Sequence, residues 1–271
     1  MSKFKTSDNV EICYQAKGEG KPIVLVHGWS QTKEVFAAQI EALSKNFKVI
    51  SYDHRGHGES ERTQIGLTLD RLAKDLKELI EHLELDKVLV AGWSMGASTI
   101  FNYVKDYGVE HLAGIVLFDM TPKLLNDDLW KMGLWHGQYT LDHALVDMTT
   151  IANDFADFGA PFFKRVAPYM SQEMIDEAMV ETMKNTPHVM NAFWLAMAVN
   201  DYRDILKDMT VPTVIAYGEK STLYSADTAE YLNQQIPHSK LEGFPGCTHL
   251  LVMENPDKAS GVIAELAAEV F

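Results

Sequence analysis

Short apolar runs alternate with longer amphipathic stretches through the first 120 residues of the chain. The runs at 22–26, 47–52, 87–91 and 114–118 have the length of strands that are buried on both faces. The stretch at 68–83 instead carries its leucines at the three- and four-residue steps of one helix face. Continuous apolar strands separated by helices form a parallel sheet with helices on both faces. We therefore expect an α/β protein.

The alternation stops after Met120. The next 85 or so residues have the pattern of helices without a convincing strand, and strand-like runs return only at 211–217 and 240–244. A last helix is expected near 256–270. This organisation predicts one core domain interrupted by a helical cap insertion, with the core in residues 1–121 and 206–271 and the cap in residues 122–205.

The composition excludes several classes of protein. The 271 residues carry a formal net charge of -14, from 38 acidic and 24 basic side chains, whereas a nucleic-acid binder needs a basic surface. No apolar run approaches the ~18 residues of a membrane span, and the start of the chain lacks the apolar stretch of a signal peptide. Cys13 and Cys247 form neither a disulfide framework nor a CxxC metal pair. We expect a cytoplasmic protein with no nucleic-acid partner, membrane insertion or metal, and the sequence indicates no particular oligomeric state.

The candidate nucleophile is Ser94. It is the central residue of segment 92–96, Gly-Trp-Ser-Met-Gly, which fits the pattern G-x-S-x-G between the strand at 87–91 and a helix expected at 97–107. In such a strand–turn–helix the serine is held in a strained turn above the edge of the sheet, and small residues two before and two after it relieve crowding of the backbone. The alternative is an unreactive serine in an ordinary glycine-rich turn.

The candidate general base is His249. It follows the last expected strand in segment 246–249, Gly-Cys-Thr-His, and comes after the serine in the chain order that this arrangement requires. The alternative at this position is a structural histidine. An oxyanion also needs donors, and we expect the main-chain N–H groups of Met95, after the serine, and of Trp29, in the loop after the first apolar strand.

Together these motifs resemble the α/β-hydrolase superfamily, and within it the branch of esterases, cofactor-free haloperoxidases and perhydrolases. The resemblance is carried by the segments 27–30 (His-Gly-Trp-Ser), 53–60 (Asp-His-Arg-Gly-His-Gly-Glu-Ser), 92–96, 246–249 and 254–256 (Glu-Asn-Pro). It covers nearly the whole chain. It implies the α/β-hydrolase fold, a mostly parallel sheet with helices on both faces and an inserted helical cap, and a catalytic triad that needs neither a metal nor an organic cofactor. In loop 53–60 it implies structural roles for Asp53 and Arg55, and no second base at His57.

The position of the acid departs from this family pattern. The family usually places an aspartate in a G-x-x-D turn, which here reads Gly-Glu-Lys-Ser at 218–221, and the neutral Ser221 cannot stabilise an imidazolium. Three hypotheses follow: Asp119 is the acid, Glu219 is the acid, or the site is a weakened dyad. We favour Asp119, which ends an apolar strand in an Asp-x-x-Pro context, because functional side chains collect at that edge of a parallel sheet. Its alternative role is to cap the following turn.

Ten of the thirteen methionines fall between residues 120 and 209, together with many aromatic residues. Methionine is flexible and polarizable, so this composition predicts a hydrophobic, tolerant pocket under a mobile cap. Aromatic and methionine side chains at helical spacing also form the core of a cap, which is the alternative explanation. Trp135 and His136 are the candidate pocket residues, since a histidine in an apolar segment is expected to face the substrate.

These observations predict a serine hydrolase that cleaves carboxylic esters of small to medium, largely hydrophobic substrates through an acyl-enzyme. Within the same chemistry a cofactor-free perhydrolase or haloperoxidase, a C–C bond hydrolase, a lactonase and a thioesterase remain open. In another class, a non-catalytic small-ligand receptor on the same fold remains open.

Overall fold

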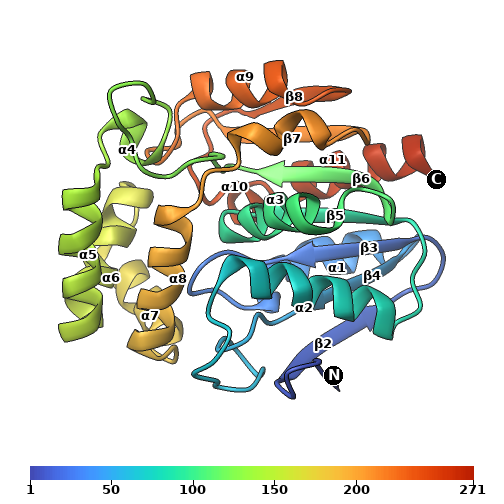
Figure 1. The fold of residues 1–271 in the computed structure, drawn as a ribbon, viewed down its shortest axis with the longest axis horizontal. Helices are drawn as coiled ribbons and strands as arrows, with labels where there is room; N and C mark the ends of the chain where they lie inside the picture. Colours follow the sequence, from blue (N-terminus) through green and yellow to red (C-terminus); the bar gives the residue numbers. More distant parts are fainter.

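An eight-stranded sheet forms the centre of the computed structural model, which describes residues 1–271 (Figure 1). The strand order is β1-β2-β4-β3-β5-β6-β7-β8. The strands are β1 (Ser2–Lys5), β2 (Glu11–Lys17), β3 (Pro22–Val26), β4 (Lys48–Tyr52), β5 (Val88–Trp93), β6 (Leu112–Phe118), β7 (Thr213–Gly218) and β8 (Ser239–Phe244). β2 runs antiparallel to β1 and β4, and all other pairs are parallel. The predicted α/β class with a mostly parallel sheet is confirmed, whereas the first two strands, β1 and β2, were not expected.

Helices cover both faces of this sheet. In β3, Val24 and Val26 pack in the core shared with helices α2 and α3, while Ile23 and Leu25 pack toward α1 and α11. This division explains why the central strands are apolar at every position, because each face meets a layer of helices. The helices of the core are α1 (Ala37–Leu43), α2 (Leu69–His82), α3 (Met95–Tyr107), α9 (Ala226–Gln235), α10 (Leu251–Glu254) and α11 (Pro256–Val270), with short 3-10 helices η1 (Lys33–Phe36) and η2 (Arg203–Asp208).

Between β6 and β7 the chain leaves the sheet and forms five helices beyond the carboxyl ends of the parallel strands (Figure 1). They are α4 (Leu134–Gly137), α5 (Leu141–Asn153), α6 (Phe155–Val166), α7 (Gln172–Thr182) and α8 (Pro187–Val199). We keep the name cap for residues 122–205. An isolated β-bridge between Lys123 and Asp201 joins the outgoing and returning ends of the cap. α5 packs against α6 and α8, and α7 packs on α6.

The loop after β4 is fixed by buried charges. The fully buried Arg55 donates hydrogen bonds of 2.7 Å to Asp75 on α2 and of 2.8 Å to Asp8. Asp53 accepts from the ammonium of Lys33 at 2.9 Å. A buried ion pair whose partner is removed leaves an uncompensated charge, so these contacts strongly favour one loop conformation.

None of the helices combines the length and apolarity that a membrane crossing requires.

Candidate active site

Ser94 occupies a strained turn at the carboxyl end of β5, directly before α3. Its φ of 56° and ψ of -122° lie outside the regions that a serine usually adopts. A Cβ on Gly96 would lie 2.0 Å from the carbonyl oxygen of Val26, and a Cβ on Gly92 would lie 2.6 Å from the backbone of Gly96. Only glycine fits at both positions, so the two glycines of the motif allow the turn to form.

Two main-chain N–H groups beside Ser94 have no acceptor within the protein. They belong to Met95, the first residue of α3, and to Trp29, in the loop after β3. A Cβ on Gly28 would lie 3.1 Å from the Cβ of Ser94, which shows how closely this loop approaches the serine. Unpaired N–H groups at a helix N-terminus and in a tight loop are suitable donors for a developing oxyanion.

Side chains tie the loop after β3, residues 27–31, to the cap. The indole Nε1 of Trp29 donates to the carbonyl of Met190 at 2.9 Å. The buried amide of Asn185 donates to the carbonyl of Ser30 at 2.9 Å, and Ser30 itself has a positive φ of 61°. The cap therefore contacts this loop through the Trp29 side chain and through the Ser30 main chain.

Hydrogen bonds fix the segment of His249, which lies just before α10. The indole of Trp93 donates to its carbonyl oxygen at 2.8 Å. The preceding residue, Thr248, donates from its N–H and its hydroxyl to the carboxylate of Glu254, at 2.6 and 2.7 Å. The imidazole is buried, and its Nδ1 lies 2.7 Å from the Oδ2 atom of Asp119. With Nδ1 bonded to a carboxylate, Nε2 is left as the basic nitrogen.

Asp119 directly follows β6 and has a positive φ of 44°. Its Oδ2 atom accepts a second hydrogen bond of 2.7 Å from the hydroxyl of Ser221, and its Oδ1 atom accepts one of 3.2 Å from the N–H of Gly218. The serine at the usual acid position thus bonds to the carboxylate that comes from another strand. Glu219 is exposed, and its carboxylate lies beside Gly243 on β8. The structure brings Asp119, and not Glu219, to His249.

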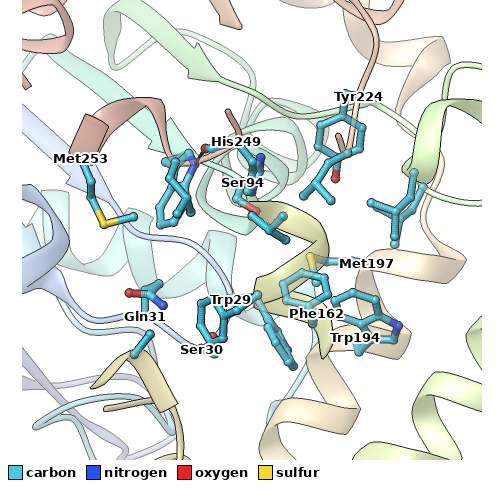
Figure 2. Close-up of a pocket in the computed structure, with 18 of the residues that line it drawn as sticks. Trp29, Ser30, Gln31, Ser94, Phe162, Trp194, Met197, Tyr224, His249 and Met253 are labelled. Carbon is cyan, nitrogen blue, oxygen red and sulfur yellow. Dashed lines mark hydrogen bonds between the residues drawn. The ribbon is translucent and has the colours of Figure 1, made fainter. Parts of the chain in front are cut away.

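Ser94 and His249 face one cavity of about 280 Å³ between the sheet edge and the cap (Figure 2). Fifteen of its twenty lining residues are hydrophobic. Among the cap methionines, Met170 and Met197 line this cavity, whereas Met190 is buried in the main core. The cavity is lined by Trp29, Ser30, Gln31, Trp93, Ser94, Leu124, Leu134, Phe162, Phe163, Val166, Met170, Ala178, Glu181, Trp194, Met197, Leu223, Tyr224, His249, Leu250 and Met253.

Trp135 and His136 lie outside this cavity, in contrast to the sequence expectation. The indole of Trp135 stacks under the guanidinium of Arg165, 3.6 Å from the ring centroid, in a separate hollow of the cap. Nε2 of His136 donates to the carbonyl of Ser221 at 2.8 Å. The imidazole of His136 therefore has its hydrogen-bond partner in the turn at 218–221, whose Ser221 also bonds to Asp119. Ser221 and Tyr224, which the structure places near His249, were not proposed from the sequence as site residues, because their contacts are not local.

One cluster outside the cavity has the donor set of a cation site. Single atoms of Cys13, Asp53 and Glu59 lie within 4.8 Å of one another. The ammonium of Lys33 lies 2.9 Å from Asp53 and 3.3 Å from Glu59. Burial lowers the pKa of Lys33, but these carboxylates outweigh burial and leave the pKa above its usual value. The chain's own cation thus occupies this cluster, which does not fit a metal ion.

Comparison with known proteins identifies the family of the chain. Residues 21–256 match the family model described as alpha/beta hydrolase fold. The chain belongs to the α/β-hydrolase family.

Relatives of similar length match nearly the whole chain. The chain is 28% identical to "AB hydrolase superfamily protein YisY" of Bacillus subtilis, over 97% of this chain and 98% of that protein. It is 28% identical to "Non-heme chloroperoxidase CPO-A1" of Kitasatospora aureofaciens, over 93% and 94% of the two chains. The solved structure of an esterase from Exiguobacterium antarcticum superposes with a TM-score of 0.89 at 23% identity, over 97% and 98% of the chains, and supports the shared fold.

Proposed function

We propose that the chain is a serine hydrolase that cleaves carboxylic esters of small to medium, largely hydrophobic substrates. The observation that supports this most directly is the buried pair of His249 and Asp119, 2.7 Å apart, which faces the same apolar cavity as Ser94. A serine, a base and an orienting carboxylate are the groups that acyl transfer requires.

In the proposed reaction, Nε2 of His249 takes the proton of Ser94 as the serine oxygen attacks the ester carbonyl. The N–H groups of Met95 and Trp29 stabilise the negative charge on the carbonyl oxygen. The protonated histidine then gives its proton to the leaving alcohol, and an acyl-enzyme remains on Ser94. Water attacks this ester with the same histidine as base, which releases the acid and restores the serine.

The test is hydrolysis of p-nitrophenyl esters from acetate to decanoate. We expect kcat/KM to rise with acyl length until the cavity is filled and then to fall, because apolar contact area drives binding. The matched control is Ser94→Ala, which removes the nucleophile from an otherwise intact cavity. Turnover that is equal in Ser94→Ala, or no turnover at any chain length, contradicts an ester-cleaving serine and favours a ligand receptor. A strong preference for small charged acyl groups contradicts the assignment of the cavity.

A second candidate is a cofactor-free perhydrolase, which relatives named as non-heme chloroperoxidases favour. Here hydrogen peroxide replaces water in the second step, so the acyl group leaves Ser94 as a peracid and the histidine receives the peroxide proton. The experiment measures peracid and free acid from one ester at increasing peroxide concentration. A peracid yield that saturates and requires Ser94 supports this candidate, whereas free acid alone supports the esterase.

A further inference from the structure

The cavity has an open end and a closed end, with Ser94 and His249 between them (Figure 2). At the open end, Met253 and Glu181 are exposed and Gln31 is half-buried. The closed end is formed by buried residues from the start of the cap, from α8 and from the segment after β7. They are Leu124, Leu134, Trp194, Met197, Leu223 and Tyr224.

Within the closed end, Tyr224 carries a hydroxyl that points toward the other labelled lining residues in Figure 2. Tyr224 is only 6% exposed, and its hydroxyl donates to the thioether sulfur of Met120 at 3.2 Å. A thioether is a weak acceptor, and a buried phenol usually finds a stronger one. Burial also raises the pKa of Tyr224 well above its ordinary value, so the hydroxyl keeps its proton.

Two other buried tyrosines, both within the cap, have strong acceptors. The hydroxyl of Tyr139 donates to the carboxylate of Asp147 at 2.7 Å. The hydroxyl of Tyr202 donates to the amide oxygen of Asn102 at 3.0 Å. Tyr224 differs from them because it lines the cavity and its hydroxyl bonds only to the sulfur of Met120. An oxygen acceptor would form a stronger hydrogen bond with this hydroxyl.

The order of the reaction assigns the acyl group to the closed end. In acyl transfer the alcohol must leave and water must enter while the acyl group stays bonded to Ser94. An open end allows this exchange, so the leaving group belongs there. The acyl chain then extends among the buried side chains around Tyr224.

We propose that Tyr224 is a specificity-determining residue that donates a hydrogen bond to an oxygen on the acyl chain, and that the preferred substrates are esters of oxo-substituted acids. This inference rests on the proposed ester-cleaving function. The oxygen replaces the sulfur of Met120 as acceptor, and the surrounding leucines, Trp194 and Met197 contact the methylene groups. No bond is made or broken at Tyr224, so it acts on the choice of substrate and not on the chemical step.

The experiment compares p-nitrophenyl esters of straight-chain acids, from pentanoate to octanoate, with analogues in which one methylene is a carbonyl at successive positions. The readout is the ratio of kcat/KM for each oxo ester to that of its alkyl counterpart. We expect this ratio to fall about tenfold in Tyr224→Phe for at least one position, since a net hydrogen bond to a buried acceptor has about this effect. In the matched control Tyr231→Phe, on α9 and outside the cavity, the ratio should equal that of the wild type. Equal ratios in Tyr224→Phe and wild type at every position overturn the proposal.

A binding measurement separates this proposal from the proposed function. Trp29, Trp93 and Trp194 line the cavity, so their fluorescence reports on binding of the intact esters to Ser94→Ala. We expect the oxo ester to bind more tightly than the alkyl ester to Ser94→Ala, and this preference to disappear in Ser94→Ala with Tyr224→Phe. If wild type shows no Ser94-dependent turnover but this preference is present, the esterase assignment fails and the Tyr224 subsite stands. If turnover is present and the preference is absent, only the subsite proposal fails.

Discussion

The nucleophile side and the acid side of this site are built in different ways. On the nucleophile side, Ser94, the proposed oxyanion donor Met95 and the two glycines come from five consecutive residues, and steric contacts such as that of Gly96 with Val26 fix the turn. On the acid side, the end of β6, the turn at 218–221 and the turn at 246–249 are separate segments that meet through hydrogen bonds. A local steric motif requires particular residues at particular positions. A site assembled from several segments can receive the same carboxylate from a different strand.

The hydrogen bond between Ser221 and Asp119 shows why the acid can come from either strand. Both side chains end within 2.7 Å of each other, beside Nδ1 of His249. A carboxylate needs to be present in that small volume, whichever residue carries it. In this chain the carboxylate comes from Asp119, directly after β6, and Ser221, three residues after β7, supplies a hydroxyl that bonds to it.

The largest expected effect is on the acid side. Asp119→Asn should lower kcat for an aryl ester by about 10³- to 10⁴-fold, because an amide cannot stabilise the imidazolium or select the required tautomer. The control is Glu219→Gln, which should keep kcat within about twofold, since this exposed carboxylate lies beside Gly243. If Glu219→Gln abolishes turnover while Asp119→Asn keeps it, the assignment of the acid is wrong.

On the nucleophile side, we expect Gly96→Ala to destabilise the protein by about 3 kcal/mol or to prevent folding. The added Cβ would lie 2.0 Å from a backbone oxygen of β3, which cannot move without disrupting the sheet. Gly261 in α11 provides the matched control, because a Cβ there meets no atom within 4 Å and Gly261→Ala should stabilise the helix by about 0.5–1 kcal/mol. Chemical denaturation measures both variants. A Gly96→Ala protein of normal stability and activity would show that the turn does not require glycine.

A pH effect on stability is expected from three buried histidines in the loops 27–31 and 53–60. His27, His54 and His57 pack together, and burial lowers the pKa of all three, that of His57 to about 4. The unfolded chain binds these protons near pH 6.5, so the stabilisation is complete above that pH and is lost as pH falls toward 4. The free energy of unfolding should therefore drop by about 2 kcal/mol or more between pH 7.5 and pH 5.

Urea unfolding at several pH values measures this drop. His57→Gln should make the dependence on pH shallower, because one of the three titrating groups is gone. An unfolding free energy that stays constant between pH 7.5 and pH 5 contradicts neutral, buried histidines at this place.

The smallest expected effect comes from removing the Ser221 hydroxyl, which bonds to Asp119. Ser221→Ala removes one hydrogen bond to Asp119 and leaves the contact with His249, so kcat should fall about three- to tenfold while KM changes little. Ser221→Thr keeps the hydroxyl and should restore most of kcat. Equal losses in the alanine and threonine variants, or a change confined to KM, indicate that residue 221 acts through packing.

The same difference between local and assembled parts decides what the sequence could predict. The central strands and the turn at Ser94 were predictable because their patterns are continuous along the chain. Strand β2 was not, since only Ile12, Cys13 and Tyr14 are buried and the strand begins and ends with a charged residue. Asp119 could be selected from its place at the end of an apolar strand. The contact of His136 with Ser221 could not, because it joins residues 85 positions apart.

The hydrogen bonds from the cap to loop 27–31 limit how the cap of this chain could be exchanged for that of a relative. The carbonyls of Met190 and Ser30 each take part in a hydrogen bond that crosses between cap and core. A chimaera could exchange the cap for that of a relative in order to change the substrate range. It would then also exchange the hydrogen-bond partners of Trp29 and Ser30 in loop 27–31. The transferable unit is therefore the cap together with the loop that it supports, and grafts that respect this boundary should retain turnover more often than grafts cut at the sheet edge.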